Sequence, residues 1–141
     1  MNALRNLTVL SLEQATVLPY LTYRLAMDGV RIIRLEHPEM GDPNRKVGTP
    51  FAPGESDMGS YFLGINAGKE ALTLNLKDPR GQQLLKELIV RLEVDVFATN
   101  QLPKNYRALG IEYETLKAVK PDLIWMGLTG FGPDSNEAAY D

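Results

Sequence analysis

Short apolar segments that favour strands alternate with helix-like segments along almost the whole chain. The expected strands, in chain order, are Leu7–Leu12, Val30–Leu35, Ala71–Leu76, Val94–Ala98 and Leu123–Leu128. Several of them are apolar at nearly every position, which is typical of strands buried on both faces of a parallel sheet. The alternation therefore predicts an α/β fold with a parallel sheet flanked by helices.

Proline and glycine mark the limits of the expected helices. Pro19 suits a first helical turn, and Gly29 suits a left-handed helix end. Asp78 followed by Pro79 reads as an N-cap and first helical position. The helices are expected at Pro19–Met27, Pro79–Leu92, Pro103–Leu109 and Glu112–Val119. Four prolines and four glycines fall between Glu36 and Ser60, so this region is expected to be a long loop.

Composition removes several kinds of site. The 141 residues contain no cysteine and a single histidine, His37, so thiolate catalysis, disulfides and a His-rich zinc centre are excluded and no metal site is expected. The net charge of −3 argues against nucleic-acid binding. Apolar runs such as Leu123–Leu128 are far shorter than the roughly 20 residues that span a bilayer. With no signal-peptide pattern at the start of the chain, a cytoplasmic protein without a membrane partner is expected.

The common phosphate-binding and catalytic motifs of α/β proteins are missing. There is no P-loop and no G-x-S-x-G, and the turn after the first expected strand, Ser11–Val17, has no glycine. Gly130 and Gly132 after the fifth expected strand could form a flexible turn or a loop whose N–H groups face an oxyanion. His37 precedes a proline in a loop, which favours an exposed or capping histidine over a triad member.

Residues that follow the strands are the candidates for ligand binding, because ligands of parallel sheets bind at the carboxyl ends of the strands. Six basic residues lie mostly at strand ends or in loops. They could be solvated surface charges, or several could converge on a phosphate-bearing ligand. These residues are Arg34, Arg45, Lys69, Lys77, Lys104 and Arg107.

An ordered set of segments carries a more specific signal. The most specific part is N-x-G-K followed by L-x-L-x-L-K-x-P-x-G, over Asn66–Gly81. The whole set comprises Val9–Arg45, Ser60–Gly81, Val94–Asn100, Leu109–Trp125, Leu128–Asp134 and the final Ala-Ala-Tyr-Asp. The set resembles the N-terminal part of the family III CoA-transferases, the CaiB/BaiF family.

The resemblance implies a Rossmann-like sheet within a large, CoA-binding domain. Residues 1–141 would be the N-terminal part of that domain, with its remainder and a small domain absent from the chain. Two complete chains would interlock as a homodimer. The chain stops at Asp141 just after a glycine-rich loop, which also suggests a chain cut short.

The resemblance also implies the chemistry. Asp141 stands at the position of the family's catalytic aspartate. It would attack an acyl-CoA and form a mixed anhydride and then an aspartyl-CoA thioester, before CoA passes to an acceptor acid. CoA and acyl-CoA would be substrates, with no permanently bound cofactor and no metal. Gly130 and Gly132 are the expected oxyanion donors.

Expected CoA contacts carry over position by position. They come from the loop after the first strand, the ends of later strands and the glycine-rich loop. They are Ala15, Thr16, Val17, His37, Leu74, Lys77, Asn100, Asn105, Leu109, Thr129 and Phe131.

The chain departs from the family pattern at several positions. His37 replaces an arginine, Ala108 replaces a basic residue with Arg107 beside it, and Gln101 follows the motif asparagine Asn100. CoA phosphates would therefore be held differently. Related acyl-CoA racemases carry a histidine where this chain has Tyr140, which points away from an isomerase. A non-catalytic CoA-binding or partner module is a further alternative.

Overall fold

Five parallel strands form one sheet in the computed structural model, which describes residues 4–54 and 56–139. The strands are β1 (Thr8–Leu12), β2 (Arg31–Glu36), β3 (Glu70–Thr73), β4 (Val96–Thr99) and β5 (Ile124–Gly127). Their spatial order is β3-β2-β1-β4-β5, so β1 lies at the centre and the chain switches direction there. This order matches the first five strands of the 3-2-1-4-5-6 order of Rossmann-type sheets, and the predicted α/β class is confirmed.

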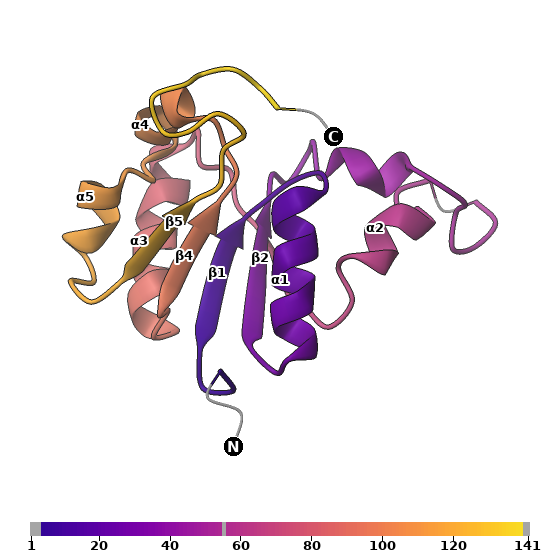
Figure 1. The fold of residues 1–141 in the computed structure, drawn as a ribbon, viewed down its shortest axis with the longest axis horizontal. Coiled ribbons are helices and arrows are strands. Elements are labelled where there is room, and N and C mark those ends of the chain that lie inside the picture. Colours follow the sequence, from indigo (N-terminus) through magenta and orange to yellow (C-terminus); the bar gives the residue numbers. More distant parts are fainter. Residues whose placement is uncertain (1–3, 55, 140–141) are drawn as a thin grey trace.

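Helices cover both faces of the sheet. Helix α1 (Val17–Met27) packs on one face, while α3 (Pro79–Arg91), α4 (Tyr106–Leu109) and α5 (Tyr113–Lys117) lie on the other (Figure 1). The carboxyl ends of the strands point to the top of Figure 1, where residues 128–139 run over them. In the described part of the chain no helix is long and apolar enough to cross a membrane.

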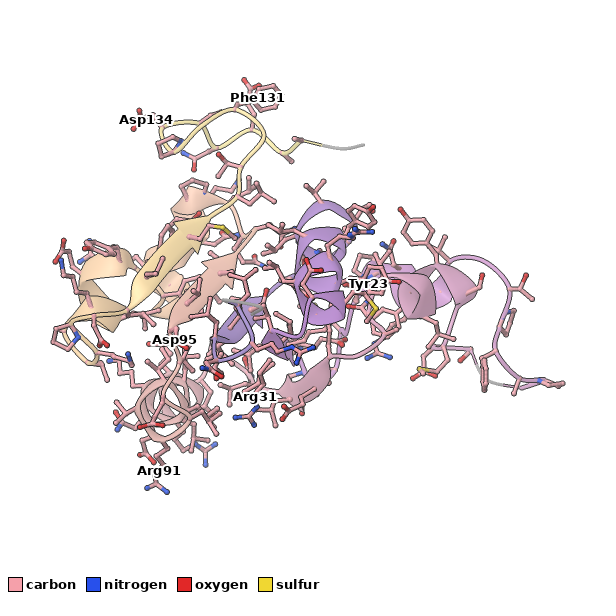
Figure 2. The ribbon with its side chains drawn as sticks, turned by 60° about the horizontal axis from the view of Figure 1, so that its bottom comes forward. Tyr23, Arg31, Arg91, Asp95, Phe131 and Asp134 are labelled. Carbon is pink, nitrogen blue, oxygen red and sulfur yellow. The ribbon has the colours of Figure 1, made fainter. Side chains whose placement is uncertain are left out.

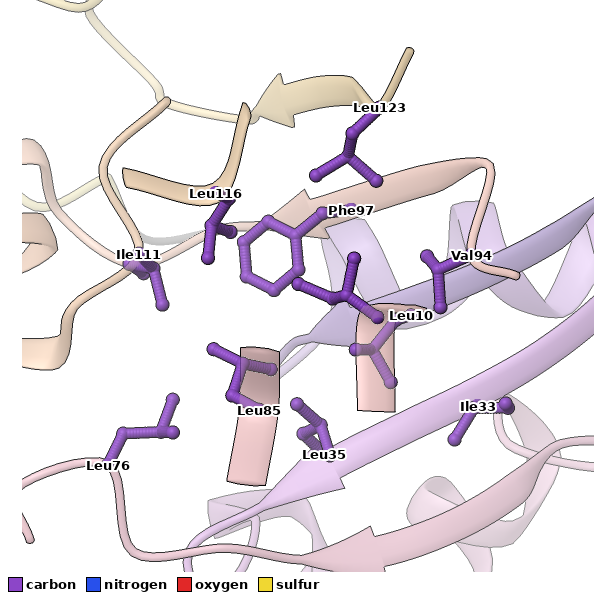
Figure 3. Close-up of a cluster of buried hydrophobic side chains, with 11 residues drawn as sticks. Leu10, Ile33, Leu35, Leu76, Leu85, Val94, Phe97, Ile111, Leu116 and Leu123 are labelled. Carbon is purple, nitrogen blue, oxygen red and sulfur yellow. The ribbon is translucent and has the colours of Figure 1, made fainter. Parts of the chain in front are cut away.

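Alternation along the strands builds two hydrophobic clusters. On the α3 face, Phe97 of β4 lies beside Leu10 of β1 and contacts the cluster of α3 and α5 side chains (Figure 3). On the α1 face, Val9 and Ile32 pack with Leu18 of the helix. Successive strand residues point to opposite faces, so the nearly continuous apolar pattern of the sequence serves both clusters.

The third strand is shorter than predicted. β3 ends at Thr73, and all four of its residues are exposed because it is the edge strand beyond β2. Leu74 still donates its N–H to the Glu36 carbonyl at 2.9 Å. Beyond it the chain turns toward α3, so Lys77 lies in a connection and not on a strand. The first helix starts two residues before the expected Pro19, since α1 begins at Val17.

The expected long loop contains regular structure. A 3-10 helix, η1 (Pro43–Lys46), is capped by Asp42, whose side chain accepts the Asn44 N–H at 2.7 Å. Helix α2 (Ser60–Gly64) follows and places Phe62 in a buried position. Outside this loop, a second short 3-10 turn, η2 (Pro103–Asn105), precedes α4. The prediction of an irregular segment from Glu36 to Ser60 is therefore wrong in part.

Candidate functional site

Two adjoining cavities lie at the carboxyl ends of the strands. The smaller one, about 330 Å³, lies between the ends of β1, β2 and β4 and the β3–α3 connection. The larger one, about 520 Å³, lies between the β1–α1 loop, the segment after β4 and the segment after β5. Gln14, Gln101 and Asn105 line both cavities. This is the edge where parallel sheets bind their ligands.

The β1–α1 loop forms one wall of the larger cavity. Ala15 has φ of +60°, in the left-handed region that glycine usually occupies. The sequence has no glycine here, and this alanine makes the turn instead. Thr16 and Val17 follow at the start of α1, where no side chain caps the helix. The first N–H groups of a helix have no partner within it, so this end of α1 offers donors to the cavity.

Polar groups of the smaller cavity sit on an apolar lining. Lys77 is exposed, and its ammonium forms no ion pair among the described residues. His37 Nδ1 accepts the backbone N–H groups of Glu39 and Met40 at 3.2 and 3.3 Å. In the neutral ring the proton is then on Nε2, which is left as a donor for a ligand. Leu12, Leu35, Leu74, Leu76 and Leu109 form the apolar part of the wall.

A buried cluster of charges lies behind the cavities, under α1 and α2. Arg34 donates to Glu36 at 2.9 Å and to Asp42, and its side chain is 1% exposed. Lys69 donates to Glu13 at 2.7 Å and is equally buried. The buried charge cluster comprises Glu13, Glu36 and Asp42 with Arg34, Arg45 and Lys69. Acidic and basic members are equal in number, which meets the need of buried charges for partners.

The buried charge cluster corrects an expectation for three basic residues. Arg34 and Lys69 are neither solvated charges nor ligand contacts, because protein groups take their donors. Arg45, more exposed, pairs with Glu36 at 2.7 Å and lies over the Phe62 ring at 3.9 Å. The N-x-G-K motif has its explanation here, since the side-chain Oδ1 of Asn66 accepts hydrogen bonds from both Arg34 and Lys69.

Burial and pairing move the pKa values of this cluster. Burial alone would raise the pKa of Glu36, but the hydrogen bonds and charges of Arg45 and Arg34 outweigh it, so the pKa lies below its ordinary value. Burial lowers the pKa of Lys69 despite the attraction of Glu13. The hydrogen bond to Glu36 raises the pKa of Arg45.

Most of the expected CoA contacts line these cavities. His37, Leu74, Lys77 and Leu109 line the smaller one, and Asn105 lines both. The larger one is lined by Ala15, Thr16, Val17, Asn100, Thr129 and Gly130. A Cβ on Gly130 would lie 2.1 Å from that of Ala139, so the approach of residues 137–139 requires glycine there.

Other expected site residues lie elsewhere. Phe131 is 60% exposed and lines neither cavity, and Figure 2 shows it on the outside of the loop after β5, pointing away from the sheet. Gly132 also lies outside the cavity linings. Asp141 lies outside the described residues.

The structure adds residues that sequence reasoning missed. Gln14 and Gln101 line both cavities, and Met40 and Gly41 close the smaller one on the side of the β2–η1 connection. Gln14 and Gln101 follow the first and fourth strands, where the sequence analysis places its candidates for ligand binding. Their position at a strand end was the one signal available, since glutamine has no charge or motif that marks a ligand site.

Comparison with known proteins agrees with this geometry. The family model for CoA-transferase family III matches residues 4–141. The chain is 35% identical to the succinyl-CoA:glutarate CoA-transferase of Mus musculus, covering all of this chain and 32% of that protein. It is 36% identical to the acetyl-CoA:oxalate CoA-transferase of Acetobacter aceti, covering 96% of this chain and 34% of that protein.

Solved structures give the same result. A CaiB/BaiF family protein from Brucella suis is 34% identical and superposes with a TM-score of 0.85, over 99% of this chain and 37% of that one. The chain thus spans about a third of the length of the relatives it matches. Because the family match extends over almost every residue, the chain belongs to CoA-transferase family III.

Proposed function

We propose that the chain is the N-terminal part of the CoA-binding domain of an enzyme that moves CoA from an acyl-CoA to a carboxylic acid. The supporting observation is the gathering of ten expected contacts and Gly130 around two adjoining cavities at one edge of the sheet. The apolar lining of the smaller cavity suits the flat face of a nucleoside base. Lys77 at its rim suits a phosphate.

A carboxylate is the proposed nucleophile, and Asp141 is the candidate within this chain. A carboxyl group ordinarily titrates well below neutral pH, so this nucleophile needs no base. Its oxygen attacks the acyl carbon, and the carbon–sulfur bond breaks to release CoA thiolate and leave a mixed anhydride. The thiolate then attacks the aspartyl carbon of the anhydride, which frees the donor acid and leaves an aspartyl-CoA thioester.

The second half of the reaction reverses these steps with the acceptor. The acceptor carboxylate attacks the thioester carbon and expels the thiolate, giving a second anhydride. The thiolate attacks the acceptor acyl carbon, which forms the new acyl-CoA and frees Asp141. Each tetrahedral oxyanion needs donors, and the Gly130 N–H beside the larger cavity is the proposed one.

Calorimetric titration of CoA into the full-length protein tests the binding part of the proposal. We expect Lys77→Ala to weaken CoA binding about tenfold, the loss expected for one charge-assisted contact. Lys117→Ala is the matched control, because Lys117 lies on α5 and contacts Tyr113. Equal affinity in wild type and Lys77→Ala would contradict the assignment of this cavity.

Transfer assays of the full-length protein test the nucleophile separately. We expect Asp141→Asn to abolish transfer while CoA still binds, whereas Asp134→Asn, on the exposed loop after β5, leaves transfer unchanged (Figure 2). Hydroxylamine should trap an aspartyl derivative during turnover of the wild type. Normal turnover of Asp141→Asn would place the nucleophile elsewhere in the enzyme.

The interlocked homodimer and the cytoplasmic location belong to the same proposal. The homodimer is what the family resemblance implies. Sedimentation equilibrium of the full-length protein and cell fractionation measure them directly.

A further inference from the structure

Four consecutive backbone groups of the β1–α1 loop are bonded to side chains from other loops. The Asn100 side chain accepts the Gln14 N–H at 3.1 Å and donates to the Gln14 carbonyl at 2.8 Å. At the next residue, Asp42 accepts the Ala15 N–H at 3.1 Å, and Asn44 donates to the Ala15 carbonyl at 2.8 Å. The loop is thus held from both sides, by the segments that follow β2 and β4.

These hydrogen bonds matter because the backbone of Ala15 is in the left-handed conformation. With φ of +60°, its Cβ crowds the following carbonyl, which costs free energy that glycine would not incur. A free loop would relax to negative φ and redirect Gln14 and Thr16. Such strained residues persist where their surroundings over-determine them, and here two side-chain bonds to one alanine do so.

The side chains of Asp42 and Asn44, which bond to Ala15, are held in place by the buried charge cluster. Asp42 is 3% exposed, and the oxygen that accepts the Ala15 N–H also accepts a hydrogen bond from Arg34. Its other oxygen accepts the Asn44 N–H at 2.7 Å, which orients Asn44 toward the loop. A chain of contacts therefore runs from the interior of β2 to the wall of the larger cavity.

We infer that Asp42, Asn44 and Asn100 are positioning residues, which shape the β1–α1 loop for its ligand; Asp42 and Asn44 do so without lining either cavity. For Asn100 this role adds to the expected CoA contact, because its amide oxygen and nitrogen each bond to Gln14 while the side chain also lines the larger cavity. The inference rests on the proposed function, since the ligand of the loop is taken to be the acyl-CoA. Gln14 lines both cavities, so the loop sets the passage between them.

Kinetics of the full-length enzyme test the inference with Asn44→Ala. We expect the KM for acyl-CoA to rise about tenfold, which corresponds to about 1.4 kcal/mol. The kcat at saturating acyl-CoA and the KM for the acceptor acid should stay within about twofold of wild type, because the variant removes no group that contacts substrate.

The decisive measurement is rescue by Ala15→Gly. Glycine adopts positive φ without the steric penalty, so we expect the KM of the Asn44→Ala, Ala15→Gly double variant to return most of the way to the wild-type value. A purely structural role of Asn44 would not be rescued by a change at position 15. Asn6→Ala combined with Ala15→Gly is the control, since Asn6 lies at the opposite edge of the sheet.

Asn100→Ala provides a second test, since it removes the two bonds to Gln14. We expect a similar rise in KM that Ala15→Gly does not reverse, because Gln14 is the residue released. An unchanged KM in Asn100→Ala, or a failure of Ala15→Gly to rescue Asn44→Ala, would overturn the inference. If wild type itself binds no CoA in calorimetry, the proposed function fails, and that result is distinguishable from either outcome.

Discussion

Arg34 lies near the middle of β2 and its side chain is buried, so each nitrogen of its guanidinium group needs a partner. Each of them donates to a protein oxygen. Nε donates to Glu36, Nη1 to Glu13 and Asn66, and Nη2 to Asp42. The Phe62 ring lies 5.0 Å from the guanidinium carbon and shields this side of the group from water. Removing one partner of such a buried pair leaves an uncompensated charge, which is more costly than the pair is stabilising.

Replacement of Arg34 by methionine is therefore expected to destabilise the protein strongly. Arg34→Met should lower the free energy of unfolding by about 3–5 kcal/mol, because three carboxylates lose a partner. Arg91→Met is the matched control, since Arg91 is 78% exposed and its pair with Glu87 is worth at most about 0.5 kcal/mol (Figure 2). Urea denaturation of both variants measures the difference, and equal losses would contradict a buried role for Arg34.

Glu36 gives the buried charge cluster a dependence on pH. Its pKa in the folded protein lies below the ordinary value of 4.5, so the folded state favours the carboxylate. The stability it contributes is present above pH 4.5 and is lost as the pH falls through the lower, folded pKa. We expect Glu36→Gln to lower the melting temperature at pH 7 and to flatten its fall below pH 4.5, in a comparison of melting curves with wild type.

Single residues also mark the limit of the sequence analysis. From the sequence, Arg34 is interpreted as a solvated charge or a phosphate contact, but it lies two residues after Ile32, on the face of the sheet that α1 covers, and is buried. The partners of Arg34, however, come from positions 13, 42 and 66, and no pattern in one sequence says which distant side chains meet. The sequence therefore does not separate the buried cations from those that are free to bind a phosphate. The structure does so, since Lys69 is buried and Lys77 is exposed.

At the scale of elements, local signals predicted some helices and missed others. Helix α3 was predicted nearly in full, because an N-cap, a proline at the first position and an apolar face all agree. Helix α2 and η1 are four or five residues long and show no amphipathic period. Asp42-Pro43 repeats the local signal of Asp78-Pro79, but no apolar face follows it. The packing of Phe62 under the Arg45 guanidinium is visible only in three dimensions.

The contrast between the starts of α1 and α3 gives a prediction about stability and binding. Asp78 accepts the Arg80 N–H at 2.9 Å, so Asp78→Ala should lower the melting temperature without a change in CoA affinity. Thr16 makes no such cap. Thr16→Ala should therefore weaken CoA binding with little loss of stability. Thermal melting paired with calorimetry separates the two effects, and the reverse pattern would contradict both assignments.

At the scale of the whole molecule, the two ends of the parallel strands differ, and they form a carboxyl edge and an opposite, amino edge of the sheet. The carboxyl edge gathers loops from all five strands around the two cavities. The opposite edge has a polar hollow of about 650 Å³, between the starts of β1, β2 and β4 and residues 119–122. Arg31 and Asp95 lie there, below the sheet in Figure 2. A hollow of that size could also hold a ligand, so volume alone does not choose the site.

Hydrogen–deuterium exchange of the full-length protein distinguishes the two edges. CoA should slow amide exchange together in residues 13–17, 37–41, 100–105 and 128–130, because one ligand in adjoining cavities contacts all of these loops. Residues 29–31, 92–95 and 119–122 at the opposite edge serve as an internal control and should exchange at the same rate with and without CoA. Protection confined to that edge would move the ligand site to the polar hollow. Protection of 13–17 alone would show that the smaller cavity takes no part, because a CoA molecule that fills both must also cover residues 37–41.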